Sequence, residues 1–155
     1  MAHDATHRGH YFEEFELGAE VVGPGRTVTE ADVMAFAGLS GDYNRIHTDA
    51  EFAKGTPYGA RIAHGLLGLS IASGLASRVG LAEDTVLAFM ALDWKFKAPI
   101  MIGDTVSLRV EVRKKRRAPS MGGGIVVLKV HLRNQRGETV QQGTWRLLVK
   151  SRPST

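Results

Sequence analysis

The feature of this sequence that most constrains its fold is an uncharged segment near its centre. Residues 62–77 contain no aspartate, glutamate, lysine or arginine, but they fall short of the roughly 20 apolar residues that a bilayer span needs. A helix predicted from about residue 64 to 79 is apolar nearly all round, so it must be enclosed. Gly65, Gly68 and Gly74 each cost up to about 1 kcal/mol of helix propensity relative to alanine. We therefore expect a sheet or a ligand to approach this helix closely.

The second half of the chain has the alternation of apolar and polar residues that is typical of strands with one wet face. Asn134–Gly137 supplies turn chemistry between two of these runs. A curved antiparallel sheet wrapped around one central helix, an α+β fold, satisfies both patterns. The alternating runs are Asp104–Arg113, Val126–Leu132, Trp145–Val149 and Leu92–Phe96, which Pro99–Gly103 turns into the next strand, and Glu20–Val28 is a further candidate interrupted at Gly23–Gly25.

One domain accounts for the whole chain. An apolar content of 43% with both signs of charge excludes disorder on compositional grounds. We expect a single domain over residues 11–150, with loose tails at 1–10 and 151–155. Before the central helix, Thr29 and the acids that follow it predict the start of another helix.

Composition also limits the chemistry. The chain has no cysteine, so it holds no disulfide, thiol nucleophile or thiolate-bound metal. Its first residues lack the apolar run of a secretory signal, which favours a cytoplasmic protein. We expect no metal, and we interpret His3, His7 and His10 as part of the tail.

The net charge of +4 favours an anionic partner. The densest basic run, Arg113–Arg117, has no interleaved aromatics and no accompanying nucleic-acid-binding motif. We interpret it as a solvated strand end, with contact to a phosphorylated small molecule as the alternative, and we expect neither a nucleic-acid nor a membrane partner.

Asp42 and His47 are the candidate proton-transfer pair. Residues five apart lie about 140° apart around a helix and on opposite faces of a strand, so the two side chains can converge only across irregular backbone. Ser40–Gly41 can end the preceding helix, and Asp42 and Asn44 tolerate turn geometry. The alternative is an aspartate turn with an incidental histidine.

A glycine in the first turn of the central helix adds a second element. Gly65 leaves backbone N–H groups open at a helix start, where the helix dipole adds partial positive charge. A carbonyl polarised there, beside a water held by a carboxylate and an imidazole, would suit addition of water to an α,β-unsaturated thioester. Ser73, on the same helix, could contact a ligand or bond to a helical carbonyl.

The order of these motifs resembles that of the MaoC-like dehydratases, a family that includes (R)-specific enoyl-CoA hydratases. The resemblance runs from about Tyr11 to Val149. It implies a hot-dog fold, a homodimer or dimer-based oligomer whose sheets join edge to edge, and a substrate tunnel near the dimer interface. The matching stretches are Phe15–Gly18, Phe36–Asp49 with its Asp-x-Asn-x-x-His signature, Ile62–Gly65, and Phe96–Pro99 with Gly103–Asp104.

The resemblance also implies roles for single residues. Asp42 and His47 match the catalytic pair, and the Gly65 N–H matches the oxyanion donor. Ser73 falls where some members place a serine near the pair, and Asn44 would orient the loop or His47. His64 would pack or position the helix start, and Tyr58 and Gly59 would shape the acyl pocket. Arg45 stands where many members of the family have proline, and it would loosen the turn before His47.

The function expected from residues and resemblance together is reversible hydration of a trans-2-enoyl-CoA to a (R)-3-hydroxyacyl-CoA. It requires no cofactor, because coenzyme A belongs to the substrate, and the basic surface suits the coenzyme A phosphates. A dicarboxylic or branched substrate of the mesaconyl-CoA type is an alternative, because Arg45 or Arg61 could bind its second carboxylate. A hot-dog acyl-CoA thioesterase and a non-catalytic acyl-CoA-binding protein also remain open, because a fold by itself does not assign a reaction.

Overall fold

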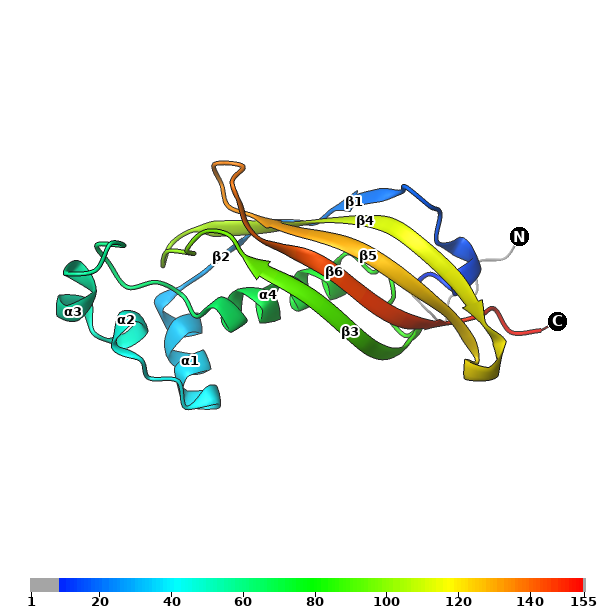
Figure 1. Cartoon of the computed structure of the whole chain (residues 1–155), viewed down its shortest axis with the longest axis horizontal. Helices are drawn as coiled ribbons and strands as arrows, with labels where there is room; N and C mark the ends of the chain where they lie inside the picture. The colour runs from blue at the N-terminus through cyan, green and yellow to red at the C-terminus, as the bar shows by residue number, and fades with distance from the viewer. Residues whose placement is uncertain (1–8, 155) are drawn as a thin grey trace.

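The core of the protein is an antiparallel sheet that curves over a single long helix (Figure 1). The structure, a computed structural model, describes residues 9–154. The sheet has the order β1-β4-β5-β6-β3, with β2 also paired to β4. Its strands are β1 (Glu20–Val22), β2 (Arg26–Thr27), β3 (Val86–Phe96), β4 (Thr105–Ala118), β5 (Gly123–Arg133) and β6 (Thr139–Lys150).

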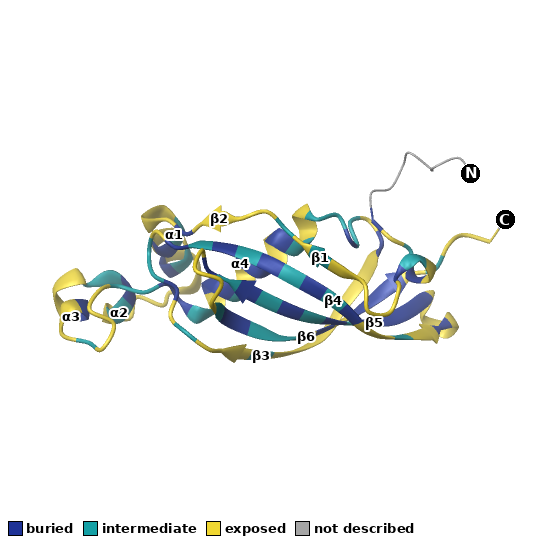
Figure 2. Ribbon diagram, turned by 90° about the horizontal axis from the view of Figure 1, so that it is seen from above, coloured by how far each residue is buried: buried dark blue, intermediate teal, exposed yellow. Residues whose placement is uncertain are grey.

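The central helix is α4 (Gly65–Arg78), and it lies against the concave face of the sheet (Figure 1). Its other side is exposed within residues 9–154, so the expectation that the helix is covered nearly all round is wrong for one chain; the exposed residues are Leu66, Ser70, Ser73, Gly74, Ser77 and Arg78. Alternate residues of β4, β5 and β6 are buried beneath it, which gives the banded pattern in Figure 2. Leu67, Ile71 and Leu75 of the helix are buried in the same apolar cluster as Leu108, Val130 and other core-facing residues of the strands. The predicted α+β arrangement of a sheet around one central helix is confirmed.

Three further helices lie beyond the N-terminal end of α4 (Figure 1). They are α1 (Glu30–Ser40), α2 (Arg45–Thr48) and α3 (Ala50–Lys54). The Thr29 side chain caps α1, as predicted, by accepting the Asp32 N–H. The two short helices were not predicted, because each rests on one side-chain cap, from Asn44 and Asp49 respectively, and is too short to show a periodic pattern.

The strand arrangement differs from expectation in one respect. β3 begins at Val86, six residues before the predicted start. Pro99–Gly103 leads the chain from β3 into β4, but these two strands do not pair with each other. β3 instead pairs with β6, at the other side of the sheet. The predicted meander of β4, β5 and β6 is confirmed, and the interrupted run near the N-terminus forms β1 and β2 as two short strands on β4.

The strand β3 is the exposed edge of the sheet (Figure 2). Within residues 9–154 no strand pairs with its outer side. It carries several large apolar side chains that are 40–54% exposed, namely Val86, Leu87, Phe89, Met90, Leu92 and Phe96. An apolar strand edge of this kind is a template for pairing with another chain.

The basic run Arg113–Arg117 lies within β4, beside a bulge between Val112 and Lys114. Lys115 turns to the core side, where its Nζ donates to the carbonyl oxygens of Phe12 (3.0 Å) and Phe15 (2.7 Å). Both belong to the segment around the short helix η1 (Phe12–Glu14). At least this cation of the run is therefore structural, while Lys114 and Arg116 are exposed.

Parts of both expected tails contact the domain. The His10 N–H donates to the Leu81 carbonyl (2.8 Å), and Arg152 bonds to the side chains of Glu13 and Glu14. Residues 1–8, with His3 and His7, and residue 155 lie outside the described residues. A second short helix, η2 (Pro119–Met121), joins β4 to β5. Among the helices of residues 9–154, none is long and apolar enough to cross a bilayer.

Truncation of a core residue of α4 should destabilise the protein strongly. Leu75 is 1% exposed, and we expect Leu75→Ala to lower the free energy of unfolding by about 2–5 kcal/mol, because it removes buried apolar contacts and leaves a cavity. Urea denaturation followed by circular dichroism measures the change. Leu39→Ala on α1, where the leucine is 85% exposed, is the matched control and should change stability by about 0.5 kcal/mol or less; equal losses in both variants would contradict the packing of α4 against the sheet.

Candidate functional site

The loop that carries Asp42 is built by the end of α1. Gly41 ends the helix with a φ of 78°, a left-handed conformation that favours glycine. The Ser40 hydroxyl donates to the Phe36 carbonyl (2.7 Å) and accepts the Asp42 N–H (3.1 Å). Asp42 Oδ1 in turn accepts the Asn44 N–H (3.2 Å). Asp42 therefore sits on the irregular backbone that the sequence predicted.

Asn44 starts the turn that presents His47. Its side-chain oxygen accepts the Ile46 N–H (3.3 Å), and its carbonyl accepts the His47 N–H (2.9 Å). Arg45, the departure from the family pattern, bonds through Nε and Nη2 to Asp49 Oδ2 at 3.0 and 2.9 Å. Since Asp49 also caps α3, this ion pair joins the two short helices at the position where proline would have restricted the chain.

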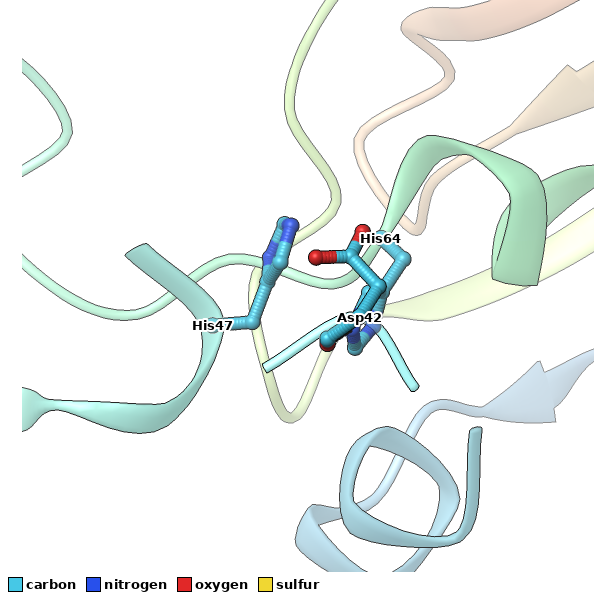
Figure 3. A group of neighbouring side chains, drawn as sticks. All are labelled: Asp42, His47 and His64. Carbon is cyan, nitrogen blue, oxygen red and sulfur yellow. Dashed lines mark hydrogen bonds between the residues drawn. The ribbon is translucent and has the colours of Figure 1, made fainter. Parts of the chain in front are cut away.

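Asp42 and His47 converge on one cavity, together with His64 (Figure 3). One side-chain oxygen or nitrogen atom from each of the three residues lies within 4.8 Å of the others, and the Asp42 carboxylate points toward the His47 ring (Figure 3). Both histidines are buried, whereas Asp42 is exposed. The cavity has a volume of about 270 Å³ and is lined by Phe36, Ser40, Asp42, His47, His64, Gly65, Leu66 and Phe96.

Hydrogen bonds to backbone carbonyls fix which tautomer each of the two histidines adopts in its neutral form. His47 Nδ1 lies 2.8 Å from the Ile62 carbonyl oxygen, and His64 Nε2 lies 2.8 Å from that of Asp42. A carbonyl oxygen only accepts, so these nitrogens carry the protons. The Nε2 of His47 is then left with a lone pair that can accept a proton. The His64 ring stacks on His47 with a centroid distance of 3.9 Å and holds the Asp42 backbone.

The start of α4 brings its first-turn amides to the same cavity. Gly65 is the first residue of the helix, and the capping residue His64 forms no side-chain cap bond. The first amides of a helix have no partner within the helix. A Cβ at position 65 would lie 2.8 Å from Cε1 of Phe96, so only glycine lets the ring lie against the helix start. The site therefore joins two proton acceptors to a helix N-terminus.

Ion pairs surround the site without entering it. Arg61 binds Glu30 through both terminal nitrogens, at 2.8 and 2.5 Å. Hydrogen bonding to Arg61 lowers the pKa of the Glu30 carboxyl from its ordinary value. The pKa of Asp49 is also lowered, first by the Phe52 N–H and then by Arg45. Both arginines singled out from the sequence thus have carboxylate partners.

The remaining predicted residues lie around this cavity or apart from it. Tyr58 lines a neighbouring cavity of about 240 Å³ that shares Gly65 and Phe96 with the first. Gly59 is exposed in the following turn, with a φ of 70°. Ser73 lies one cavity further along α4, in an apolar cavity of about 260 Å³ beside Phe89, and its hydroxyl donates to the Ser70 carbonyl (2.6 Å). Within one chain, Ser73 is therefore not brought to the Asp42–His47 pair.

Asp42, His47 and His64 are also close enough together to be considered as metal ligands. The two imidazole planes are inclined by only 28° at a centroid distance of 3.9 Å. Imidazole lone pairs lie in the ring plane, so those of two stacked rings lie in nearly parallel planes, which is unfavourable for directing both at one ion. The arrangement suits proton transfer better than metal binding.

Two aromatic residues of the cavity had no role in the sequence interpretation. Phe36 packs on His64 with a centroid distance of 4.9 Å, and Phe96 closes the cavity from β3. Phe96 belongs to one of the stretches that resemble the family, so its aromatic ring at the end of an alternating run was a visible signal. Phe36, on α1, begins another of these stretches, Phe36–Asp49, so the resemblance pointed to it as well.

The fold and this site define a hot-dog domain with a carboxylate–imidazole cavity at the start of its central helix. A Mycobacterium tuberculosis protein described as having a double hotdog fold aligns with 96% of this chain, and with 46% of its own, at a TM-score of 0.84 and 22% identity. An Archaeoglobus fulgius protein described as a monoamine oxidase regulatory protein aligns at a TM-score of 0.86 and 40% identity, over 94% of this chain and 97% of its own.

The sequence profile of the MaoC like domain matches residues 14–132, and the chain belongs to this family. The (R)-specific enoyl-CoA hydratase of Rhodospirillum rubrum is 37% identical over 66% of this chain and 69% of its own length. Protein MaoC of Klebsiella aerogenes is 35% identical over 68% of this chain, but the match spans only 31% of that longer protein.

The tautomers of the two histidines can be measured directly. We expect neutral His47 to carry its proton on Nδ1 and neutral His64 on Nε2, because each of these nitrogens faces a backbone carbonyl. Long-range ¹H–¹⁵N correlation spectra of the imidazole rings, assigned with His47→Gln and His64→Gln variants, distinguish the two forms. An Nε2-protonated His47 would remove the lone pair from the cavity and contradict this arrangement.

Proposed function

We propose that this protein catalyses the reversible addition of water to a trans-2-enoyl-CoA, giving a (R)-3-hydroxyacyl-CoA. The observation that carries the proposal is the convergence of the Asp42 carboxylate and the His47 imidazole on a cavity that also contains Gly65 at a helix start. The names of the relatives, (R)-specific enoyl-CoA hydratase and 3-hydroxybutyryl-CoA dehydratase, support this reaction class and its stereochemistry.

The two side chains are suited to hold one water molecule. An ionised carboxylate and the unprotonated Nε2 of His47 are both acceptors, so a water can donate one hydrogen bond to each. Its oxygen lone pair is then free to attack Cβ of the enoyl group. Holding the water and the substrate in this geometry removes much of the entropic cost of their reaction.

The proton and electron balance follows from this placement. The bond from the water oxygen to Cβ forms as a proton passes to the Asp42–His47 pair. The π electrons of the double bond move toward the thioester, and the developing negative charge lies on its oxygen near the Gly65 N–H. The pair then returns the proton to Cα. Because two such close groups titrate as a unit, the removed proton belongs to the pair rather than to one residue.

The partners of the two arginines favour a substrate without a second carboxylate. A mesaconyl-type substrate needs a cation for its additional carboxylate, but Arg45 is bound to Asp49 and Arg61 to Glu30. Neither lines the cavity that holds Asp42 and His47. An acyl group without a free carboxylate is therefore the better fit to this site.

Hydration of crotonyl-CoA by the purified chain tests the proposal. We expect loss of the enoyl absorbance and formation of the (R) product. Asp42→Asn and His47→Gln should each reduce kcat by at least about 10²-fold, because each removes one proton acceptor of the pair. Glu51→Gln also removes one carboxylate, but Glu51 is exposed on α3 and does not line the cavity. It is the matched control, and its kcat should stay within about twofold of wild type.

The same experiment distinguishes a hydratase from a thioesterase and from a binding protein. Release of free thiol from acyl-CoA without hydration would identify a thioesterase. Binding of acyl-CoA without turnover would identify a binding protein. Full activity in both Asp42→Asn and His47→Gln would reject the proposed pair, whatever the substrate.

We also propose that two copies of this chain pair through β3 to form a homodimer. The strand is exposed along its length and carries large apolar side chains on an open edge. In antiparallel pairing around a two-fold axis at the strand centre, Phe96 of each chain would lie near Val86 of the other. Phe96 lines the Asp42–His47 cavity, and Val86 lines the apolar cavity that contains Ser73. The dimer would thus join these two cavities across its interface.

Dimer formation can be tested with one added charge. We expect the wild-type chain to sediment at twice its mass of 16.8 kDa and Met90→Lys to shift it toward the monomer, because two like charges would meet near the axis. Leu39→Lys, on exposed α1, is the control and should remain dimeric. A wild-type chain that stays monomeric at micromolar concentration would refute the proposal.

A further inference from the structure

Gln141 is a polar side chain buried between the sheet and the first turn of α4. It comes from β6 and is 2% exposed. Its Oε1 accepts the indole N–H of Trp94, and its Nε2 donates to the Gly65 carbonyl, both at 2.9 Å. An indole N–H only donates and a carbonyl only accepts, so the two partners together determine which way the amide faces. Trp94, Gln141 and Gly65 thus form an oriented chain of hydrogen bonds.

The glycine at position 68 makes room for this amide. A Cβ at Gly68 would lie 2.3 Å from Nε2 of Gln141 and 2.8 Å from its Cδ. Any larger residue would therefore displace the Gln141 amide from α4. A glycine in the second turn lowers the helix propensity. It also leaves the space in which the Gln141 side chain of the sheet donates a hydrogen bond to the helix backbone.

We propose that Gln141 is a positioning residue: by holding the Gly65 carbonyl it fixes the first turn of α4, and with it the direction of the Gly65 N–H, in the preceding peptide plane, toward the thioester oxygen. The inference rests on the proposed hydratase function and concerns the same site. Gly65 has no Cβ, so its own sterics restrict its backbone little. The neighbouring His64 supplies no side-chain cap bond, because its ring is bonded to the Asp42 carbonyl. One helical bond, from the Gly68 N–H to the His64 carbonyl (3.2 Å), holds the peptide plane that contains the Gly65 N–H. The groups packed against Gly65 supply the remaining restraint.

Two groups from the sheet supply that restraint. The ring of Phe96 lies against Gly65 on one side, and the Gln141 amide holds its carbonyl on another. Phe96 and Gln141 are directly paired residues of β3 and β6, so the register of one strand pair sets both contacts. A shift of even 1 Å in a catalytic group can cost about 10²-fold in rate, which makes the bond from Gln141 a sensitive point.

The variant Gln141→Glu tests this role. A glutamate keeps the shape and still accepts from Trp94, but its ionised form has no proton to donate to the Gly65 carbonyl. We expect kcat for crotonyl-CoA to fall about tenfold or more at pH 8, with KM within about twofold of wild type. As the pH is lowered the glutamate protonates and becomes a donor again, helped by burial, which raises the pKa of a carboxyl. The ratio of variant to wild-type kcat should therefore rise toward one.

Gln142→Glu is the matched control. It places the same charge on the next residue of β6, which points to the opposite face of the sheet. We expect its kcat to stay within about twofold of wild type, with no rise of the ratio at low pH. A merely structural loss in Gln141→Glu would lower activity at every pH, and that result would overturn the proposal, as would an unchanged kcat.

Two further measurements keep the inference apart from the proposed function. Hydrogen–deuterium exchange of peptides covering residues 64–72 needs no substrate, and it should be faster in Gln141→Glu than in wild type or Gln142→Glu. If the wild-type chain does not hydrate crotonyl-CoA, the proposed function is rejected. If exchange in Gln141→Glu is the same as in wild type, the anchoring role of Gln141 is rejected, whatever the activity. If Gln141→Glu does not fold, Trp94→Phe decides, because it removes the donor that orients the amide; an unaltered kcat in that variant would overturn the inference.

Discussion

The burial of α4 against the concave face of the sheet is the constraint on which the rest of the structure depends. A helix with a broad apolar face is stable in water only when other elements cover that face. The packing of α4 against β4, β5 and β6 fixes the place where its first turn emerges at the end of the sheet (Figure 1). That first turn holds Gly65, so the core determines where polarising amides become available.

The site gains its proton chemistry from bonds between side chains and backbone carbonyls. His47 is held by the Ile62 carbonyl, and His64 by the Asp42 carbonyl. These bonds orient both rings and leave an acceptor nitrogen of His47 for the cavity. They also link the segment that follows α1 to the residues just before α4. Two loops that are separated in sequence are thus joined at the point where the carboxylate and imidazole meet.

The strand β3 has two roles that follow from one position at the sheet edge. Its end supplies Trp94 and Phe96, which contact Gln141 and the start of α4. Its outer side is exposed and apolar, as expected of a strand that pairs with another chain. Dimer formation through this edge would therefore act on a strand that also shapes the Asp42–His47 cavity.

Local patterns in the sequence determined much of this protein. Alternation specified β4, β5 and β6, the Thr29 cap specified α1, and the apolar run without charge specified α4 as the central helix, because each depends on residues near one another in the chain. The spacing of Asp42, His47 and Gly65 already indicated one site. Only the tertiary structure decided that β3 pairs with β6, that Ser73 lies in a separate cavity of the chain, and that Gln141 reaches Gly65. These features depend on strand register and on contacts between residues distant in sequence, which no local pattern records.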